Sequence, residues 1–249
     1  MGKTFSIARR ELAGYFYSPL AYGIGALFLC VCAFKFAPPP AFWGGAREWF
    51  ILVPHQQASL RPLFEMMGAA MVVAAPLLTM RLISEELRGG TIETLLTAPV
   101  TDVQVVVGKF LGVLMFYLTL LGGTLIFLVL MFVFARPDAG VVVMGYLGMI
   151  LLGSAFLAVG VFASTLTRHQ LLAAAAAIVI LSFFSLLMSP AAAHLPEPWN
   201  ETAARLNAMQ YLKSFSRGLF DSRGVVFFLS ITGGFLFLSV KLVESRRWR

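Results

Sequence analysis

Residues able to perform chemistry are few in this chain of 249 residues, and their spacing matches no catalytic site. Met1-Gly-Lys-Thr4 contains a Gly-Lys-Thr triplet, but a phosphate-binding loop needs GxxxxGK[ST] after a strand. The three histidines, His55, His169 and His194, fall in three different predicted loops, so we expect no shared metal site. No HExxH or GxSxG motif is present. We therefore predict no enzyme activity, no metal and no directly bound cofactor.

Three further residues have chemical potential inside apolar runs. Cys30 and Cys32 lie two positions apart without histidine or acidic neighbours, which favours small core hydrophobes over a disulfide or metal pair. Glu65 interrupts another apolar run, and an acid within a membrane span is a candidate for ion coupling or substrate contact. Arg61 precedes it by four residues, so a local ion pair at the membrane edge is the interpretation that we favour.

The elements that position these residues must lie in lipid. Hydrophobic residues make up 59% of the chain and charged residues only 12%, against about 25% charged in a soluble domain. The net charge of +7 would suggest nucleic acid in a soluble chain. In a membrane chain it indicates Lys and Arg retained on the cytoplasmic side, so we expect no nucleic-acid partner.

Uncharged runs predict six membrane-spanning helices. Crossing the hydrocarbon core takes about 20 helical residues, and continuous rather than alternating apolar runs favour helices over barrel strands. The chain is thus predicted to be an all-α polytopic membrane protein with one membrane domain over 1–249. The expected spans are 20–36, 62–81, 108–134, 141–164, 170–188 and 224–241.

An even number of spans places both termini on one side. The ends and even loops hold eleven Lys and Arg, against eight in the odd loops, which favours both termini in the cytoplasm. The protein would lie in the cytoplasmic (inner) membrane, and residues 82–107 would form a loop on its cytoplasmic side. Residues 189–223 would form an extracytoplasmic loop with short helices, and 37–61 an aromatic cap at the outer surface.

Residues 3–17 predict an amphipathic helix on the inner membrane surface. Apolar residues recur there at helical spacing, and charged residues lie mostly on the remaining circumference. Pro19 ends the helix, so that it meets the first span at a corner. The apolar residues are Phe5, Ala8, Leu12 and Phe16. The charged residues are Lys3, Arg9, Arg10 and Glu11.

The loop at 81–109 is the most polar part of the chain. Gly89-Gly90 predicts a helix end, Thr91 a new helix cap, and Pro99 the end of that short helix. Ile92, Leu95 and Leu96 would give the short helix an apolar face. It would form a rigid, projecting short helix to which another protein could bind. An ordinary solvated connector is the alternative.

Five segments resemble a known family. Glu85-Glu86-x-Arg88-x-Gly90-Thr91-x-Glu93-x-Leu95-Leu96-x-x-Pro99-Val100, followed by Gly108-Lys109, resembles the loop between spans two and three of type 2 ABC exporter permeases. Ala8-Arg-Arg-Glu11-Leu-x-x-Tyr15-Phe-x-Ser18-Pro19 is similar to the interface helix of that family, and Ser164–Gln170 to its fourth-to-fifth loop. Phe215–Arg223 and Leu242–Trp248 resemble the gliding-motility-associated branch.

The resemblance implies a partner and contact residues. A coupling helix near Gly90 to Pro99 would dock into a separate ATPase subunit, and residues 3–17, with Arg9, Arg10 and Glu11, would lie between ATPase and membrane. His169 departs from the acidic residue or Asn expected at its position. The implied coupling residues are Glu85, Glu86, Arg88, Gly90, Thr91, Glu93, Leu95, Leu96, Pro99, Thr167, Arg168, His169 and Gln170.

The expected function is that of an ABC exporter permease subunit. It would move an unidentified substrate, with ATP and Mg bound in an ATPase dimer and a second permease subunit completing the path. A scaffold or mechanical transducer of an ATP-driven envelope or gliding-motility machine is the alternative. A proton-coupled carrier is disfavoured because intramembrane acids are scarce.

Overall fold

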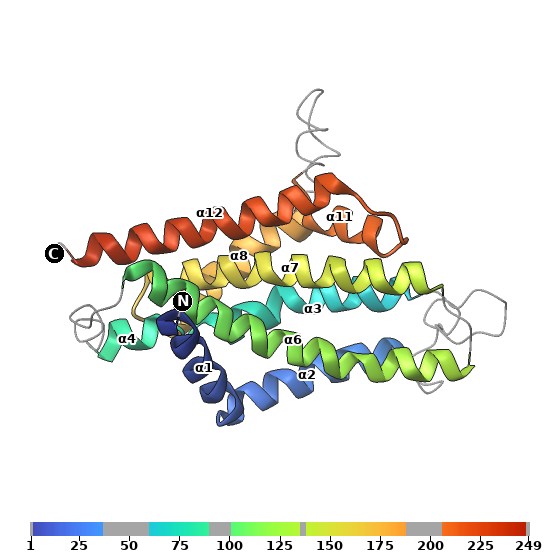
Figure 1. The fold of residues 1–249 in the computed structure, drawn as a ribbon, viewed down its shortest axis with the longest axis horizontal. Coiled ribbons are helices and arrows are strands. Elements are labelled where there is room, and N and C mark those ends of the chain that lie inside the picture. Colours follow the sequence, from blue (N-terminus) through green and yellow to red (C-terminus); the bar gives the residue numbers. More distant parts are fainter. Residues whose placement is uncertain (1, 37–59, 90–100, 135–137, 188–205, 248–249) are drawn as a thin grey trace.

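The computed structural model describes residues 2–36, 60–89, 101–134, 138–187 and 206–247, and all regular structure in these ranges is helical. The all-α prediction is therefore confirmed. The long helices lie side by side in a bundle, and both termini lie at the end that holds α4 (Figure 1). The short helix predicted at 90–99 lies outside the described residues, as do 37–59 and 188–205.

The helices follow the predicted apolar runs. They are α1 (Gly2–Phe16), α2 (Pro19–Phe36), α3 (Arg61–Thr79), α4 (Ser84–Gly89), α6 (Asp102–Phe134), α7 (Ala139–Leu166), α8 (Gln170–Ser182), the π-helical turn η2 (Phe183–Leu187), α11 (Ala208–Phe215) and α12 (Ser222–Arg247).

Four of these stretches are long and apolar enough to cross a membrane: Arg61–Gly89, Asp102–Phe132, Ala139–Leu166 and Ser222–Arg246. The α1 and α2 helices together make a fifth candidate, bent by 75° between them. This bend is the corner predicted at Pro19. Gln170–Ser185 is a shorter apolar helix, so the span predicted at 170–188 stays a prediction.

The α6 helix begins at Asp102, before the span that was predicted to start at residue 108. The backbone N–H of Gln104 donates to Oγ1 of Thr101 (3.3 Å), and the N–H of Thr101 donates to Oε1 of Gln104 (3.2 Å). This reciprocal pair is a capping box, in which two side chains satisfy free backbone N–H groups at a helix start. The helix therefore starts at Asp102, and Lys109 lies in its second turn.

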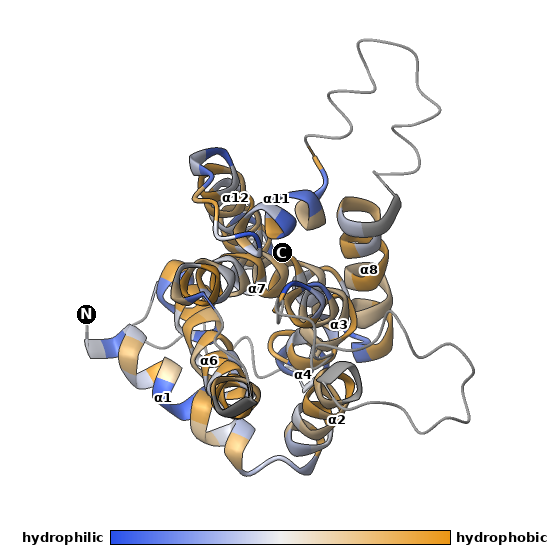
Figure 2. Cartoon of the chain, turned by 90° about the vertical axis from the view of Figure 1, so that its right-hand side faces the viewer, coloured by the Kyte–Doolittle hydropathy of each residue, from blue (hydrophilic) through white to orange (hydrophobic). Residues whose placement is uncertain are grey.

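The α7 helix lies between α3, α6 and α12 (Figure 2). Glycines on α7 admit large neighbours: a Cβ at Gly153 would lie 2.2 Å from the Tyr117 ring, and one at Gly160 would lie 2.1 Å from Oγ1 of Thr79. Such small residues let helices pack closely in a membrane, where van der Waals contact is a main source of association. They make α7 the central helix of the bundle.

The outward faces of the bundle are apolar as well (Figure 2). Ile126 and Val129 of α6 and Phe237 of α12 are each about 60% exposed. A soluble protein rarely exposes such faces, whereas hydrocarbon is a favourable solvent for them. Cys30 is exposed, Cys32 is buried, and both thiols are free.

A short helix, α11, packs back against the bundle within the predicted outer loop. The side chain of Asn207 caps it by accepting from the N–H of Met209 (2.8 Å). Leu212 lies over Gly68 of α3, and Phe215 lies over Gly148 of α7. Glycines at both contacts leave room for these buried side chains.

Candidate functional site

The candidate site begins where α1 packs on α6. A Cβ at Gly112 would lie 2.6 Å from Cβ of Glu11, and one at Gly108 would lie 2.9 Å from Cβ of Ile7. The two helices approach this closely because α6 presents two glycines one turn apart on the same face. Lys109 follows the first of these glycines.

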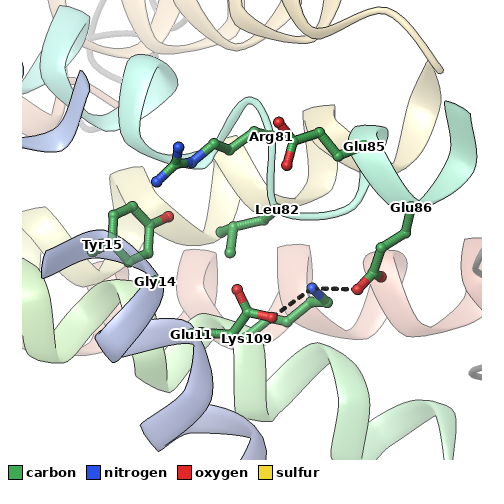
Figure 3. A pocket seen from close by; sticks show the side chains of 8 residues that line it. All are labelled: Glu11, Gly14, Tyr15, Arg81, Leu82, Glu85, Glu86 and Lys109. Atoms are coloured by element: carbon green, nitrogen blue, oxygen red, sulfur yellow. Dashed lines mark hydrogen bonds and ion pairs between the residues drawn. The ribbon is translucent and has the colours of Figure 1, made fainter. Parts of the chain in front are cut away.

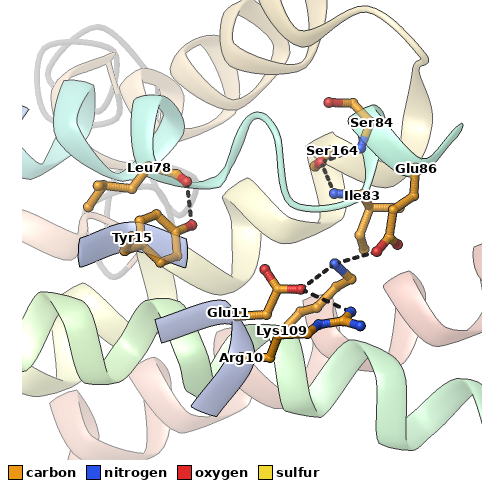
Figure 4. A network of polar contacts seen from close by, with 9 residues as sticks. All are labelled: Arg10, Glu11, Tyr15, Leu78, Ile83, Ser84, Glu86, Lys109 and Ser164. Carbon is orange, nitrogen blue, oxygen red and sulfur yellow. Dashed lines mark hydrogen bonds and ion pairs between the residues drawn. The ribbon is translucent and has the colours of Figure 1, made fainter. Parts of the chain in front are cut away.

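Lys109 joins three elements through a buried ion cluster (Figure 4). Its side chain is 3% exposed, and its Nζ lies 2.9 Å from Oε1 of Glu11 and 2.8 Å from Oε1 of Glu86. Glu11 belongs to α1, Glu86 to α4 and Lys109 to α6. A buried ammonium requires such partners, since its desolvation is strongly unfavourable without them. We call these three residues the Lys109 triad.

A polar pocket of about 280 Å³ opens beside the triad (Figure 3). Three carboxylates face it against two cationic groups, so the lining has a small excess of negative charge. The pocket is lined by Glu11, Gly14, Tyr15, Arg81, Leu82, Glu85, Glu86 and Lys109.

Tyr15 ties α1 to the end of α3. Its hydroxyl donates to the carbonyl oxygen of Leu78 (2.6 Å), and the guanidinium of Arg81 lies 5.2 Å from the centre of its ring. Arg81 in turn donates from Nη1 to Oγ of Ser18 (2.8 Å), at the corner between α1 and α2. Burial raises the pKa of Tyr15 well above its usual range, which keeps the phenol protonated as a donor.

A break between α3 and α4 is held by α7. Oγ of Ser164 accepts from the N–H groups of Ile83 (3.0 Å) and Ser84 (3.1 Å) and donates to the carbonyl of Met80 (3.3 Å). The hydroxyl of Ser84 also donates to the Met80 carbonyl. These bonds satisfy backbone groups that the break frees from the helical pattern.

Two polar links reach the loop between α7 and α8. Nε2 of Gln170, the first residue of α8 after this loop, donates to Oε1 of Glu85 (2.8 Å) and so connects the start of α8 to α4. Nη2 of Arg246, near the end of α12, donates to the carbonyls of Thr165 (2.8 Å) and Leu166 (3.3 Å) at the end of α7. A cation at a helix C-terminus also interacts favourably with the helix dipole.

The structure brings together Glu11, Glu85, Glu86 and Gln170 from the predicted contact residues. Glu11 faces inward, whereas its helix pattern placed it with the outward charges. Glu65 is exposed in the second turn of α3. Arg9, Arg88, Arg168 and His169 are exposed, Arg10 lies 3.7 Å from Glu11, and Thr167 ends α7. Gly90, Thr91, Glu93, Leu95, Leu96 and Pro99 lie outside the described residues.

Sequence reasoning did not assign contacts to Lys109, Tyr15, Arg81 or Ser164. For Lys109 a signal was available, because a lysine between long apolar runs requires a partner. For Tyr15 and Ser164 the sequence carries no such signal, since their partners are backbone atoms far along the chain. Within the described ranges, no group of three or more His, Cys, Asp or Glu side chains is arranged to hold a metal.

These features define a class: a multi-pass helical membrane protein with a buried ion cluster at the end that holds α4 and both termini. The family model for ABC-2 family transporter proteins matches residues 6–219, most of the chain. The protein belongs to this family of ABC transporter membrane permeases, whose membrane domain has no catalytic activity itself. Membership implies an ATPase partner. No curated protein matches the chain significantly.

Proposed function

We propose that this protein is the permease subunit of an ABC exporter, which moves a substrate across the cytoplasmic membrane using ATP hydrolysis by a separate ATPase subunit. The supporting observation is the anchoring of α4, the helix that leads into the predicted coupling segment. Through Lys109, Ser164 and Gln170, α4 contacts α6, α7 and the start of α8. A force applied to the loop would therefore be transmitted to several apolar helices at once.

The mechanism follows from this anchoring. The end of the bundle that holds α4 and both termini would face the cytoplasm, where the segment from Gly90 to Pro99 docks on the ATPase. Thr167 to Gln170 would make the second contact. Closure of two ATPase subunits, which hold ATP and Mg, would move both loops. A second permease subunit, identical or homologous, would complete a path at the interface.

The test uses the permease and its ATPase, purified together and reconstituted in vesicles. Deleting residues 90–99, or the substitution Glu93→Lys, should abolish permease-stimulated ATP hydrolysis and leave membrane insertion intact. Glu244→Lys is the control, because Glu244 is exposed and pairs with Lys241 on the surface of α12. Normal stimulation by the deletion variant would refute the coupling role.

A resemblance to the gliding-motility-associated branch favours a second candidate function, a mechanical transducer of an envelope machine. It rests on the resemblance of Phe215–Arg223 and Leu242–Trp248. A substrate screen in the same vesicles separates the two functions. ATP-dependent movement of a solute supports the exporter, whereas coupled hydrolysis without movement of any tested solute supports the transducer.

A further inference from the structure

We propose that Lys109 is a positioning residue that makes the interface helix α1 move together with α4 when the ATPase acts. The proposal rests on the proposed function, because it concerns how movement at the coupling loop is distributed. Its structural part, a single ammonium that joins α1 to α4, follows from the contacts of the described residues.

The geometry places one cation between two helices that otherwise belong to distant parts of the chain. Glu11 is 98 residues from Lys109, and both carboxylates lie within 3 Å of the same Nζ. Since the side chain of Lys109 is almost fully buried, solvent only weakly screens its attraction to both carboxylates. Displacement of Glu86 with α4 therefore draws the ammonium, and with it Glu11 and α1.

Other charges near the triad do not replace this link. Arg10 lies 3.7 Å from Glu11 but is two-thirds exposed, so solvent screens its attraction. Arg81 donates to Ser18, and Glu85 accepts from Gln170, although both residues line the same pocket. Lys109 is thus the cation that pairs with a carboxylate of α1 and with one of α4.

Packing makes α1 suited to follow as a rigid unit. Gly112 brings the backbone of α6 close to Glu11, and Tyr15, one turn later on α1, bonds to Leu78 at the end of α3. The Lys109 triad and Tyr15 therefore hold one face of α1 against both neighbouring helices. Replacing a buried ion cluster by apolar side chains is often neutral or stabilising, so folding alone does not require the Lys109 triad.

Two single substitutions test the proposal without leaving an unpaired charge. Glu86→Leu keeps the pair between Lys109 and Glu11, and Glu11→Leu keeps the pair between Lys109 and Glu86. Each variant retains a neutral buried pair but removes the ionic link between α1 and α4. Glu244→Leu is the matched control, because it removes an exposed glutamate whose partner is also exposed.

The first measurement is ATP hydrolysis by the reconstituted complex. Each triad variant should lower permease-stimulated hydrolysis by about tenfold, a size typical of single residues that carry coupling. The two variants should show the same loss although they lie on different helices, and Glu244→Leu should match the wild type. Stimulation within twofold of the wild type in either triad variant would overturn the proposal. Absence of stimulation in the wild type would instead refute the proposed function.

The second measurement reports movement and separates positioning from folding. Spin labels at Phe5→Cys on α1 and Val143→Cys on α7, both exposed positions, give a distance across the molecule once Cys30 and Cys32 are replaced by alanine. In the wild-type complex the distance should change when a non-hydrolysable ATP analogue is added. In both triad variants the change should be lost, while the ATPase still co-purifies. An equal change in the variants would show that α1 moves independently of Lys109.

Discussion

The hydroxyl of Tyr15 donates a 2.6 Å hydrogen bond to the carbonyl oxygen of Leu78, across 63 positions of the chain. In a continuous helix that carbonyl would accept from the N–H of Leu82, but this N–H donates to Thr79 instead (3.0 Å). Tyr15 therefore supplies a donor where α3 ends. One phenol from α1 thus stabilises the end of a predicted membrane span.

Tyr15→Phe should lower the free energy of unfolding by about 1 to 2 kcal/mol, because it leaves a buried acceptor without this donor. The ring can still stack on Phe116, whose centroid is 5.0 Å away, so packing is preserved. The thermal unfolding midpoint in detergent measures the effect. Tyr17→Phe is the control, since Tyr17 is 88% exposed, and an equal loss in both variants would contradict the assignment.

The same tyrosine predicts a pH effect. Burial raises the pKa of Tyr15 in the folded protein, whereas an unfolded tyrosine titrates near 10. Above about pH 10 the unfolded state holds fewer protons, so stability falls as pH rises. The contribution of Tyr15 is thus complete below that pH and is lost above it. The stability difference between wild type and Tyr15→Phe should shrink at alkaline pH, and a constant difference would argue against the buried phenol.

Ser164→Ala should destabilise the break between α3 and α4 by about 2 kcal/mol, because two buried N–H groups lose their acceptor. Hydrogen exchange should become faster at residues 83–84. Ser154→Ala is a matched control on the same helix, since its hydroxyl donates to Leu151 of α7 itself (2.7 Å). Unchanged exchange in the Ser164 variant would show that α7 does not hold the break.

Gly112→Ala should lower stability by about 1 to 3 kcal/mol, because the added methyl group overlaps Glu11 and forces α1 away from α6. The variant should also expose α1 to limited proteolysis. Gly122→Ala lies on the same helix with nothing within 4 Å of the new Cβ. It should be neutral or stabilising by up to about 1 kcal/mol, since alanine favours helix over glycine. Equal behaviour of the two variants would refute close packing at Gly112.

Arg246→Gln should loosen the end of α7, because it removes the charge from the donor to Thr165 and Leu166. Amide exchange at 167–170 should rise about fivefold, which corresponds to about 1 kcal/mol of local stability. Lys241→Gln, at an exposed surface pair on the same helix, should leave this exchange unchanged. Equal exchange in the Arg246 variant and the wild type would show that α12 does not stabilise this loop.

Local patterns in the sequence were sufficient for the class and most of the helices. Long uncharged runs predicted helices in lipid, since charge at the bilayer centre is costly, and Pro19 predicted the corner between α1 and α2. The start of α6 at Asp102 could also have been predicted from the sequence, because Thr101 and Gln104 have capping-box spacing. Each of these features depends on residues only a few positions apart.

The tertiary structure alone decided which side chains meet. Helical spacing placed Glu11 on one side of α1, but whether that side faces water or Lys109 depends on how α1 packs against α6. Lys109, Tyr15 and Ser164 find partners that lie from 23 to 98 positions away. The sequence by itself determined that this is a helical membrane protein. Packing at the glycines of α6 and α7 decided where its buried charges and hydrogen bonds connect, because close helix contact sets which faces meet.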